Sequence, residues 1–158
     1  SPGFRWGTSI LPGQAITWEH LMDQTAITYP NVTVNDLTGE AIKTVLEDIG
    51  DNLFNPDPYY QQGGDMVRVG GLEYVCRPTE TMGKRIHDMR IKGKLIDPNK
   101  KYKVAGWAPV AEEAKNQNLK PVWEVAEQWL KASGGRVKAR KLNTPKLEGV
   151  LPNPGFAA

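Results

Sequence analysis

Few residues of this chain have the types and spacing that catalysis or metal binding requires. The two histidines, His20 and His87, are far apart and fall in no HxH, HExxH or CxxC pattern. Cys76 is the single cysteine, lies in a run typical of a strand, and is expected to be a small buried side chain. The sequence has no G-x-S-x-G motif and no phosphate-binding loop. We therefore predict neither a complete metal site nor a nucleophilic centre in this chain.

Arg5 is the residue best suited to bind an anion. It lies between Phe4 and Trp6 in a loop rich in glycine and proline, which would let its guanidinium approach an oxyanion closely. The guanidinium offers a bidentate fork for phosphate or sulfate-like groups. On these residues alone an ordinary surface arginine is the simpler interpretation, and both interpretations stay open.

The composition is that of a globular protein. The chain has 158 residues, 24% charged and 39% hydrophobic, which suits one compact domain. A net charge of +2 gives no indication of nucleic-acid binding, and no run of 18 apolar residues could span a membrane. The acidic residues are scattered on predicted helix faces, where solvated charge is the default interpretation. The sequence begins Ser-Pro-Gly-Phe without Met, so we expect it to start inside a longer protein.

Local signals predict three helices. Thr17 can cap a short helix, and Thr38 can cap a second one whose apolar residues recur at helical spacing. Gly50 is expected to end that second helix. A third begins at Pro121, ends at the glycine pair 134–135 and carries Trp129, which is expected in the core, as is Trp18 on the first helix.

The strand signals are clearest in residues 83–106. An apolar run at residues 86–91 is followed by Gly93, which allows a tight turn, and residues 97–100 (DPNK) have the composition of a second turn. A strand follows and ends at Gly106. Further strands are predicted at residues 26–34, 66–69 and 72–76, and a long polar loop with two tyrosines occupies residues 55–64. This order predicts an α+β domain with a mixed sheet and flanking helices.

Five segments, in order, resemble the C-terminal domain of the 5'-nucleotidase family. The sequence GFR at 3–5 is similar to the family's G-G-I-R. Residues 11–21, which contain LPG, IT and HL, are similar to the family's L-P-x-G-x-I-T-x-x-D-L. LTGEAI at 37–42 and GDMVRVGGLEY at 64–74 also match. The stretch 83–105 resembles G-x-R-V-x-x-V-x-V-x-G-x-P-L-D-P-x-x-x-Y-x-V-A. The resemblance implies a substrate-binding domain of this type at residues 1–135, with an extended tail, 136–158, packed on it or trailing from it.

The resemblance also implies how the site is divided between domains. In that family an N-terminal metallophosphatase domain holds two divalent metal ions, with manganese expected here, and the C-terminal domain supplies substrate contacts. The arginine of G-G-I-R touches the anionic group being hydrolysed, and it maps onto Arg5. This makes Arg5 the candidate catalytic and substrate-binding residue, while no metal ligand is expected in this chain.

Two departures from the family pattern argue against a nucleotide substrate. The family clamps the base between two aromatic residues, in F-G-N and N-D-F. Here the first region reads TYPN at 28–31 and the second GWAP at 106–109, so the Asp and Phe of the second are absent. Without these residues, the site loses most of the contacts that would stack a base and hydrogen-bond a ribose.

Three landmarks resemble the thiosulfohydrolase branch of the family: residues 1–7, 23–30 and 59–65. That branch releases sulfate from a cysteine S-thiosulfonate on the SoxYZ carrier during periplasmic thiosulfate oxidation. The resemblance implies a periplasmic enzyme with SoxYZ and its own N-terminal domain as partners, and neither nucleic acid nor membrane. The candidate residues for the channel of the carrier arm are Tyr29, Asn31, Tyr59, Tyr60 and Trp107, each of which could instead serve packing.

Two alternatives remain open at this point. The parent could be a periplasmic 5'-nucleotidase or phosphodiesterase, or the chain could be a non-catalytic module that docks a carrier protein. As part of a thiosulfohydrolase, the 158-residue fragment is expected to be inactive alone, because the metal ligands are missing from it.

Overall fold

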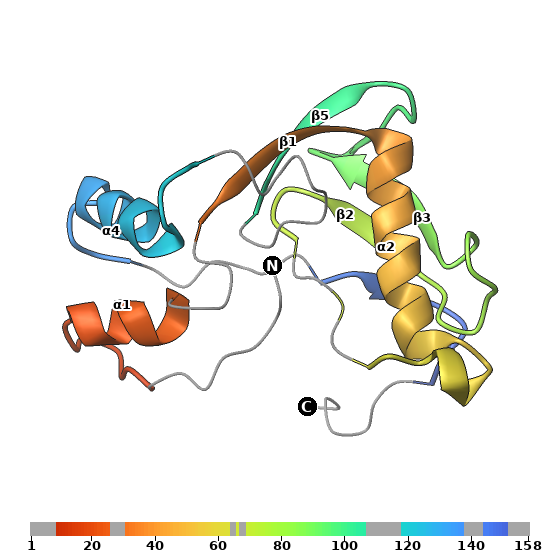
Figure 1. Cartoon of the computed structure of the whole chain (residues 1–158), viewed down its shortest axis with the longest axis horizontal. Helices are drawn as coiled ribbons and strands as arrows, with labels where there is room; N and C mark the ends of the chain where they lie inside the picture. Colours follow the sequence, from red (N-terminus) through yellow and green to blue (C-terminus); the bar gives the residue numbers. More distant parts are fainter. Residues whose placement is uncertain are drawn as a thin grey trace. The chain divides into compact units, whose positions relative to one another are not determined.

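The computed structural model describes residues 9–25, 31–63, 66, 69–106, 118–137 and 144–151 (Figure 1). The described residues form helices and a run of consecutive strands, which confirms the predicted α+β class. Their order is α1 (Trp18–Thr25), β1 (Thr33–Thr38), α2 (Gly39–Phe54), the 3-10 turn η1 (Pro58–Tyr60), β2 (Glu73–Cys76), β3 (Ile86–Ile91), β4 (Lys94–Leu95), β5 (Lys101–Gly106), α4 (Val122–Ala132) and β6 (Lys146–Leu147). The described residues fall into two compact units, one of residues 9–36 and 103–137, the other of residues 37–102 and 144–151.

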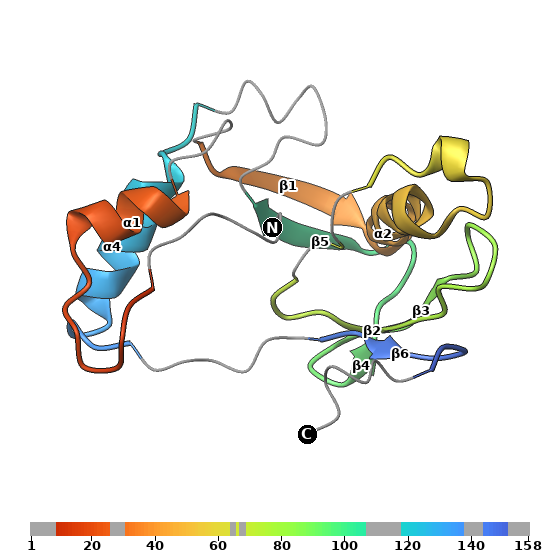
Figure 2. The ribbon, with the colours of Figure 1, turned by 90° about the horizontal axis from the view of Figure 1, so that it is seen from below.

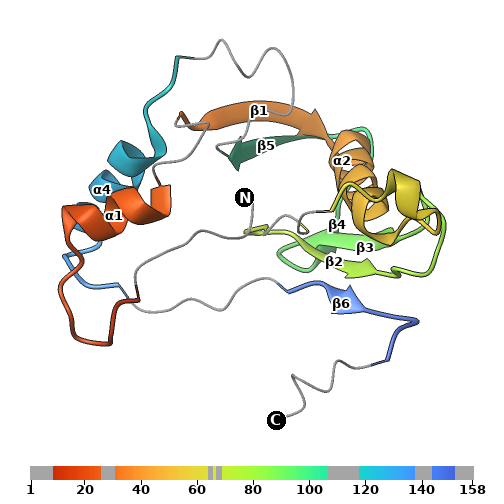
Figure 3. The ribbon, with the colours of Figure 1, turned by 60° about the horizontal axis from the view of Figure 1, so that its bottom comes forward.

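The second unit contains a mixed four-stranded sheet in the order β4-β3-β2-β6. Neighbouring strands are antiparallel except β2 and β6, which run parallel. Helix α2 lies along one face of this sheet (Figure 3). The core forms between them, from Leu46, Leu72, Tyr74, Cys76, Ile86 and Met89.

The start of α2 is capped as predicted. The Thr38 hydroxyl oxygen accepts a hydrogen bond from the backbone N–H of Ala41 at 3.1 Å, which satisfies one of the free donors of the first turn. The N–H of Gly39 donates to the carbonyl of Lys100 at 3.1 Å, and that of Glu40 to the carbonyl of Pro98 at 3.0 Å. The turn after β4 therefore completes the cap of α2.

That turn has the predicted chemistry. The carboxylate of Asp97 accepts from the N–H of Asn99 at 2.9 Å, and its carbonyl accepts from the N–H of Lys100 at 3.3 Å. The N–H of Asp97 donates to the hydroxyl of Tyr102 at 2.8 Å. The turn is thus held at both ends, and its carbonyl edge is fixed against the helix.

Gly50 does not end α2, so this prediction was wrong. The helix continues to Phe54 and stops at Asn55, the residue before Pro56, where the proline disfavours helical backbone. Gly50 is buried, and a Cβ built on it would lie 3.8 Å from Cδ of Arg85. Position 50 thus lies in the helix interior and packs near the Arg85 side chain, which local sequence signals do not report.

The predicted strands agree with the structure in part. β3 and β5 fall where expected, and Gly93 in the turn after β3 has a φ of 76°. β4 was not predicted, and β1 runs to Thr38 rather than ending at Val34. β1 extends because it pairs with β5 in a two-stranded sheet, which is a tertiary effect. Residues 26–30, 67 and 68 lie outside the described part.

The first unit contains α1 and α4, which pack side by side (Figure 2). Thr17 and His20 cap α1 reciprocally, because each backbone N–H donates to the other's side chain, at 3.1 and 3.4 Å. α4 follows Pro121 and ends before the glycines at 134–135, as predicted. Trp18 and Trp129 are exposed, so their assignment to the core was wrong; Leu21 is the one buried residue of α1, and α4 has none.

A salt-bridged cluster attaches β6 to β2. The N–H of Glu148 donates to the carbonyl of Cys76 at 3.0 Å, and its carboxylate pairs with Lys146 at 2.8 Å and Arg77 at 2.9 Å. Hydrogen bonds from Lys146 and then Arg77 lower the pKa of Glu148 to about 2. The C-terminal segment 146–148 is thus part of the sheet.

We expect Gly39→Ala to destabilise the second unit. A Cβ there would overlap the carbonyl oxygen of Asp97 and lie 3.1 Å from Cα of Pro98, so backbone must move, at a loss of about 1–3 kcal/mol. Gly50→Ala is the matched control, since its methyl group fits and alanine favours a helix interior by about 0.5–1 kcal/mol. Urea unfolding of both variants checks this, and equal effects would contradict it.

Glu148→Gln tests the cluster at β6. A pKa lowered from 4.5 to about 2 means that the charge stabilises the folded state above pH 4.5 and loses that effect as the pH falls toward 2. The variant should therefore be modestly less stable than wild type at pH 7, and the difference should shrink as the pH is lowered from 5 to 3. A difference in unfolding free energy that stays constant over this range would show that the charge is not its source.

Candidate functional site

Two predicted site residues, Tyr59 and Tyr60, lie next to each other on the turn η1. Their side chains are 95% and 65% exposed. The turn forms because the carboxylate of Asp57 accepts from the N–H of Tyr59 at 3.0 Å, while Pro58 supplies a φ suited to the first helical position. The N–H of Tyr60 also donates to the carbonyl of Asp57, at 3.1 Å. Both phenol rings are thus presented to solvent from an ordered backbone.

Asn55 connects this turn to the end of α2. Its side-chain oxygen accepts from the N–H of Asp57 at 3.0 Å, and its amide donates to the carboxylate of Asp51 at 2.8 Å. Its carbonyl accepts from the side chain of Gln61 at 2.7 Å. One asparagine therefore bonds both sides of the tyrosine turn and the last turn of the helix.

The side chain of Arg85 binds Asp51 and the C-terminal end of α2. Its side chain is 1% exposed and donates to the carboxylate of Asp51 at 2.6 Å, to the carbonyl of Phe54 at 3.1 Å and to the carbonyl of Pro78 at 3.3 Å. A guanidinium at a helix C-terminus satisfies free carbonyls and complements the helix dipole. The hydrogen bond from Arg85, then that from Asn55, lowers the pKa of Asp51.

Glu47, one helical turn before Asp51, holds the backbone of the same segment. It is 3% exposed, and its carboxylate accepts from the N–H groups of Gly83 at 2.8 Å, Arg85 at 3.2 Å and Ile86 at 2.7 Å. Backbone donors of this kind satisfy a buried carboxylate. Helix α2 thus binds residues 83–86 at two points. Glu47 binds their backbone, and Asp51 binds the Arg85 side chain.

Sequence reasoning missed both Glu47 and Arg85. It treated acidic residues on helix faces as solvated, and it described the apolar run at residues 86–91 without assigning a role to Arg85. No clear signal was available, because Glu47 stands at none of the helical spacings that connect the apolar residues 42, 45, 46 and 49. Its burial follows from the contact of α2 with residues 83–86, where a carboxylate requires hydrogen-bond partners.

Of the other predicted site residues, Asn31 lies within the described part of the chain. Asn31 is exposed, belongs to the other compact unit and forms an isolated antiparallel bridge with Pro121. Arg5, Tyr29 and Trp107 lie outside the described residues. Their roles remain predictions.

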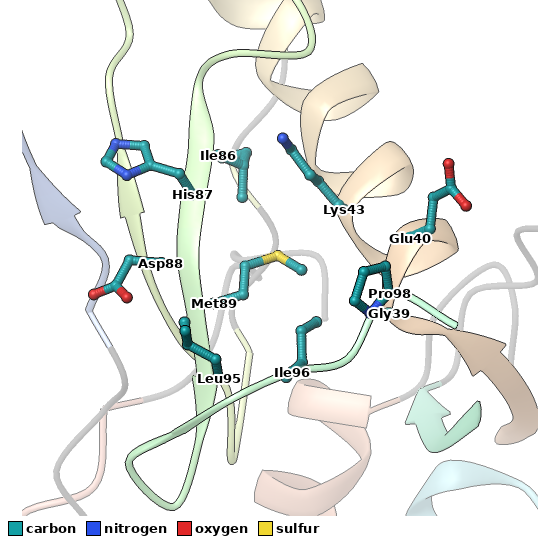
Figure 4. A pocket seen from close by; sticks show the side chains of 10 residues that line it. All are labelled: Gly39, Glu40, Lys43, Ile86, His87, Asp88, Met89, Leu95, Ile96 and Pro98. Atoms are coloured by element: carbon teal, nitrogen blue, oxygen red, sulfur yellow. The ribbon is translucent and has the colours of Figure 1, made fainter. Parts of the chain in front are cut away.

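A hollow of about 510 Å³ lies beside the start of α2 (Figure 4). Ile86, Met89 and Ile96 give it an apolar floor. Figure 4 shows Lys43 on one side of β3 and His87 on the other, so the polar residues do not converge on one point. The full lining comprises Gly39, Glu40, Lys43, Ile86, His87, Asp88, Met89, Leu95, Ile96 and Pro98.

The described residues offer little reactive chemistry of their own. Cys76 is buried, as predicted, and burial raises the pKa of its thiol. Among the residues of known placement, no group of three or more His, Cys, Asp or Glu could hold a metal ion. No described helix is long and apolar enough to cross a membrane.

A model of the 5'-nucleotidase C-terminal domain family matches residues 1–120. The chain belongs to this family. It is similar to the sulfate thiohydrolase SoxB of Thermus thermophilus, solved in complex with glycerol, with 44% identity and a TM-score of 0.81 over 95% of this chain. The predicted family is therefore confirmed.

A second solved structure shares the fold alone. A candidate 5'-nucleotidase from Staphylococcus aureus, in complex with α-ketoglutarate, is 13% identical with a TM-score of 0.57 over 84% of this chain. The present chain spans only 28% of the SoxB chain and 30% of the Staphylococcus aureus chain. A search among curated proteins found no match.

Arg85→Ala should destabilise the second unit by about 1–3 kcal/mol, because the carbonyls of Phe54 and Pro78 lose their donor; the Asp51 carboxylate also loses its partner. Arg90→Ala is the matched control. Arg90 also pairs with an aspartate, Asp88, but these side chains are 39% and 44% exposed, so a much smaller loss is expected. Denaturant unfolding of the two variants checks the difference, and similar losses would contradict the assigned role of burial.

Proposed function

We propose that this chain is the substrate-side C-terminal domain of a thiosulfohydrolase. Its substrate would be a cysteine S-thiosulfonate carried on a SoxYZ-type protein, from which the enzyme releases sulfate. The observation that carries the proposal is the 44% identity to SoxB over 95% of this chain. The match to the 5'-nucleotidase C-terminal domain family supports hydrolysis at a tetrahedral oxyanion centre as the general chemistry.

Arg5 is the residue proposed to act on the substrate directly. Its guanidinium would bind the sulfonate oxygens and stabilise the charge that develops on them. Tyr29, Asn31 and Trp107 are proposed to line the channel for the carrier arm together with the tyrosines of η1. A polypeptide substrate favours a lined channel over a nucleoside clamp, which agrees with the sequences at 28–31 and 106–109.

The remaining parts of the proposal concern the parent protein. The two metal ions, manganese by family resemblance, would be bound by an N-terminal metallophosphatase domain, because the described part of this chain offers no ligand cluster for them. The parent would work in the periplasm. Within the chain, the division between a domain at 1–135 and a tail at 136–158 stays a proposal.

Steady-state kinetics of the full-length parent on thiosulfonated SoxYZ test this function. Arg5→Ala should lower kcat by about 10²–10³, as expected for the loss of one oxyanion donor. Arg136→Ala, which removes an exposed arginine of the same chain, is the control and should leave kcat unchanged. An unaffected Arg5→Ala enzyme, or a parent that prefers AMP to the carrier, would refute the proposal.

The isolated 158-residue chain should not turn over thiosulfonated carrier even with added manganese. The reason is that the metal ligands would belong to the domain that precedes it. Sulfate release can be followed by ion chromatography against the full-length enzyme at equal concentration. Turnover at a comparable rate would contradict the proposed division of labour.

A further inference from the structure

The exposure of the tyrosine turn has no explanation in folding. Tyr59 at 95% and Tyr60 at 65% exposure bury little apolar surface, so neither ring contributes much to stability. Adjacent exposed aromatic rings are typical of surfaces that bind a partner, where tyrosine is enriched among the residues that carry affinity.

The backbone beneath these rings is nevertheless firmly held. Asn55 bonds both sides of the turn, and the N–H of Gly63 donates to the carbonyl of Asn52 at 3.2 Å where the loop returns to α2. Through Asp51 the turn is tied to the buried guanidinium of Arg85. A binding surface ordered in advance loses less conformational entropy when its partner arrives.

The charge of the turn indicates what kind of partner fits. Residues 55–63 (NPDPYYQQG) contain one charged residue, Asp57, and no cation. A free oxyanion such as thiosulfate would meet a negative charge and no guanidinium or ammonium. Neutral phenol and amide groups instead suit a polypeptide, whose backbone they can contact by stacking and hydrogen bonding.

We infer that Asn55 is a positioning residue, which fixes Tyr59 and Tyr60 as a contact surface for the polypeptide of the carrier rather than for its sulfonate. This inference rests on the proposed function for the identity of the carrier. Asn55 acts through the tyrosines and does not touch the substrate. The sulfonate is left to Arg5, so recognition of the carrier and of its cargo is divided between separate residues.

The test compares two substrates of the full-length enzyme, thiosulfonated SoxYZ and free cysteine S-thiosulfonate. Tyr59→Ala should raise KM for the carrier about tenfold more than KM for the free amino acid, as expected for one interface residue worth about 1.4 kcal/mol. Asn55→Ala should produce the same selectivity, several-fold, with kcat on saturating carrier little changed. Leu151→Ala, which shortens a 92% exposed side chain elsewhere, is the control and should leave both KM values unchanged.

A spectroscopic measurement separates positioning from a general loss of structure. 3-Fluorotyrosine placed at position 59 of the full-length enzyme should give a ¹⁹F resonance distinct from that of the free amino acid. Asn55→Ala should narrow that resonance and move it toward the free value, while the far-UV circular dichroism stays that of wild type.

Two outcomes would overturn the inference. If Tyr59→Ala and Tyr60→Ala affect the two substrates equally in an active enzyme, the turn does not recognise the carrier, although the proposed function stands. If the wild-type enzyme hydrolyses neither substrate, the proposed function fails and the inference fails with it.

Discussion

The structure of the second unit depends on the burial of one guanidinium, that of Arg85. A charge removed from water must be matched nearby, and here the match comes from Asp51 and from carbonyl oxygens of Phe54 and Pro78. Glu47 fixes the backbone of the same segment. These contacts are satisfied only in one register of α2 on β3, because a shift of either element would leave charged groups buried without partners. An apolar interface alone would discriminate less sharply between registers.

The contacts at both ends of α2 depend on this register. At its start, the turn at residues 97–100 meets the helix so closely that a Cβ on Gly39 would overlap the carbonyl of Asp97. At its end, the Asp51 carboxylate that binds Arg85 also binds Asn55, which organises the tyrosine turn. The position of α2, which is fixed in the core, thus also fixes the turn at residues 97–100 and the tyrosine turn. Gly50 belongs to the same arrangement, since it packs near the Arg85 side chain.

Structural features that depend on a few neighbouring residues could be predicted from the sequence. The cap at Thr38, the turn at 97–100 and the helix start at Pro121 each depend on local hydrogen bonds or on the fixed φ of proline. Features decided by distant partners could not be predicted. The helix passes Gly50 because tertiary packing overrides a local stop signal, and Glu47 and Arg85 are recognisable as buried only once both elements are in place. Of the predicted site, the tyrosine pair and Asn31 are described, whereas Arg5, Tyr29 and Trp107 lie outside the described residues.

The buried polar contacts hold the fold, whereas the exposed side chains are free to differ with the substrate. Arg85, Glu47 and Asp51 engage one another and the backbone, so none of their described contacts requires a particular substrate. The tyrosine turn is different, because its rings face solvent and its backbone alone is tied to the core. Side chains on such a turn can change without disturbing the anchor, provided that Asn55 and Asp57 keep the backbone in place. A family fold can therefore serve chemically different substrates by altering exposed side chains over a fixed polar core. Under this scheme, the sequences at 28–31 and 106–109 can depart from the family's F-G-N and N-D-F while the family fold is kept.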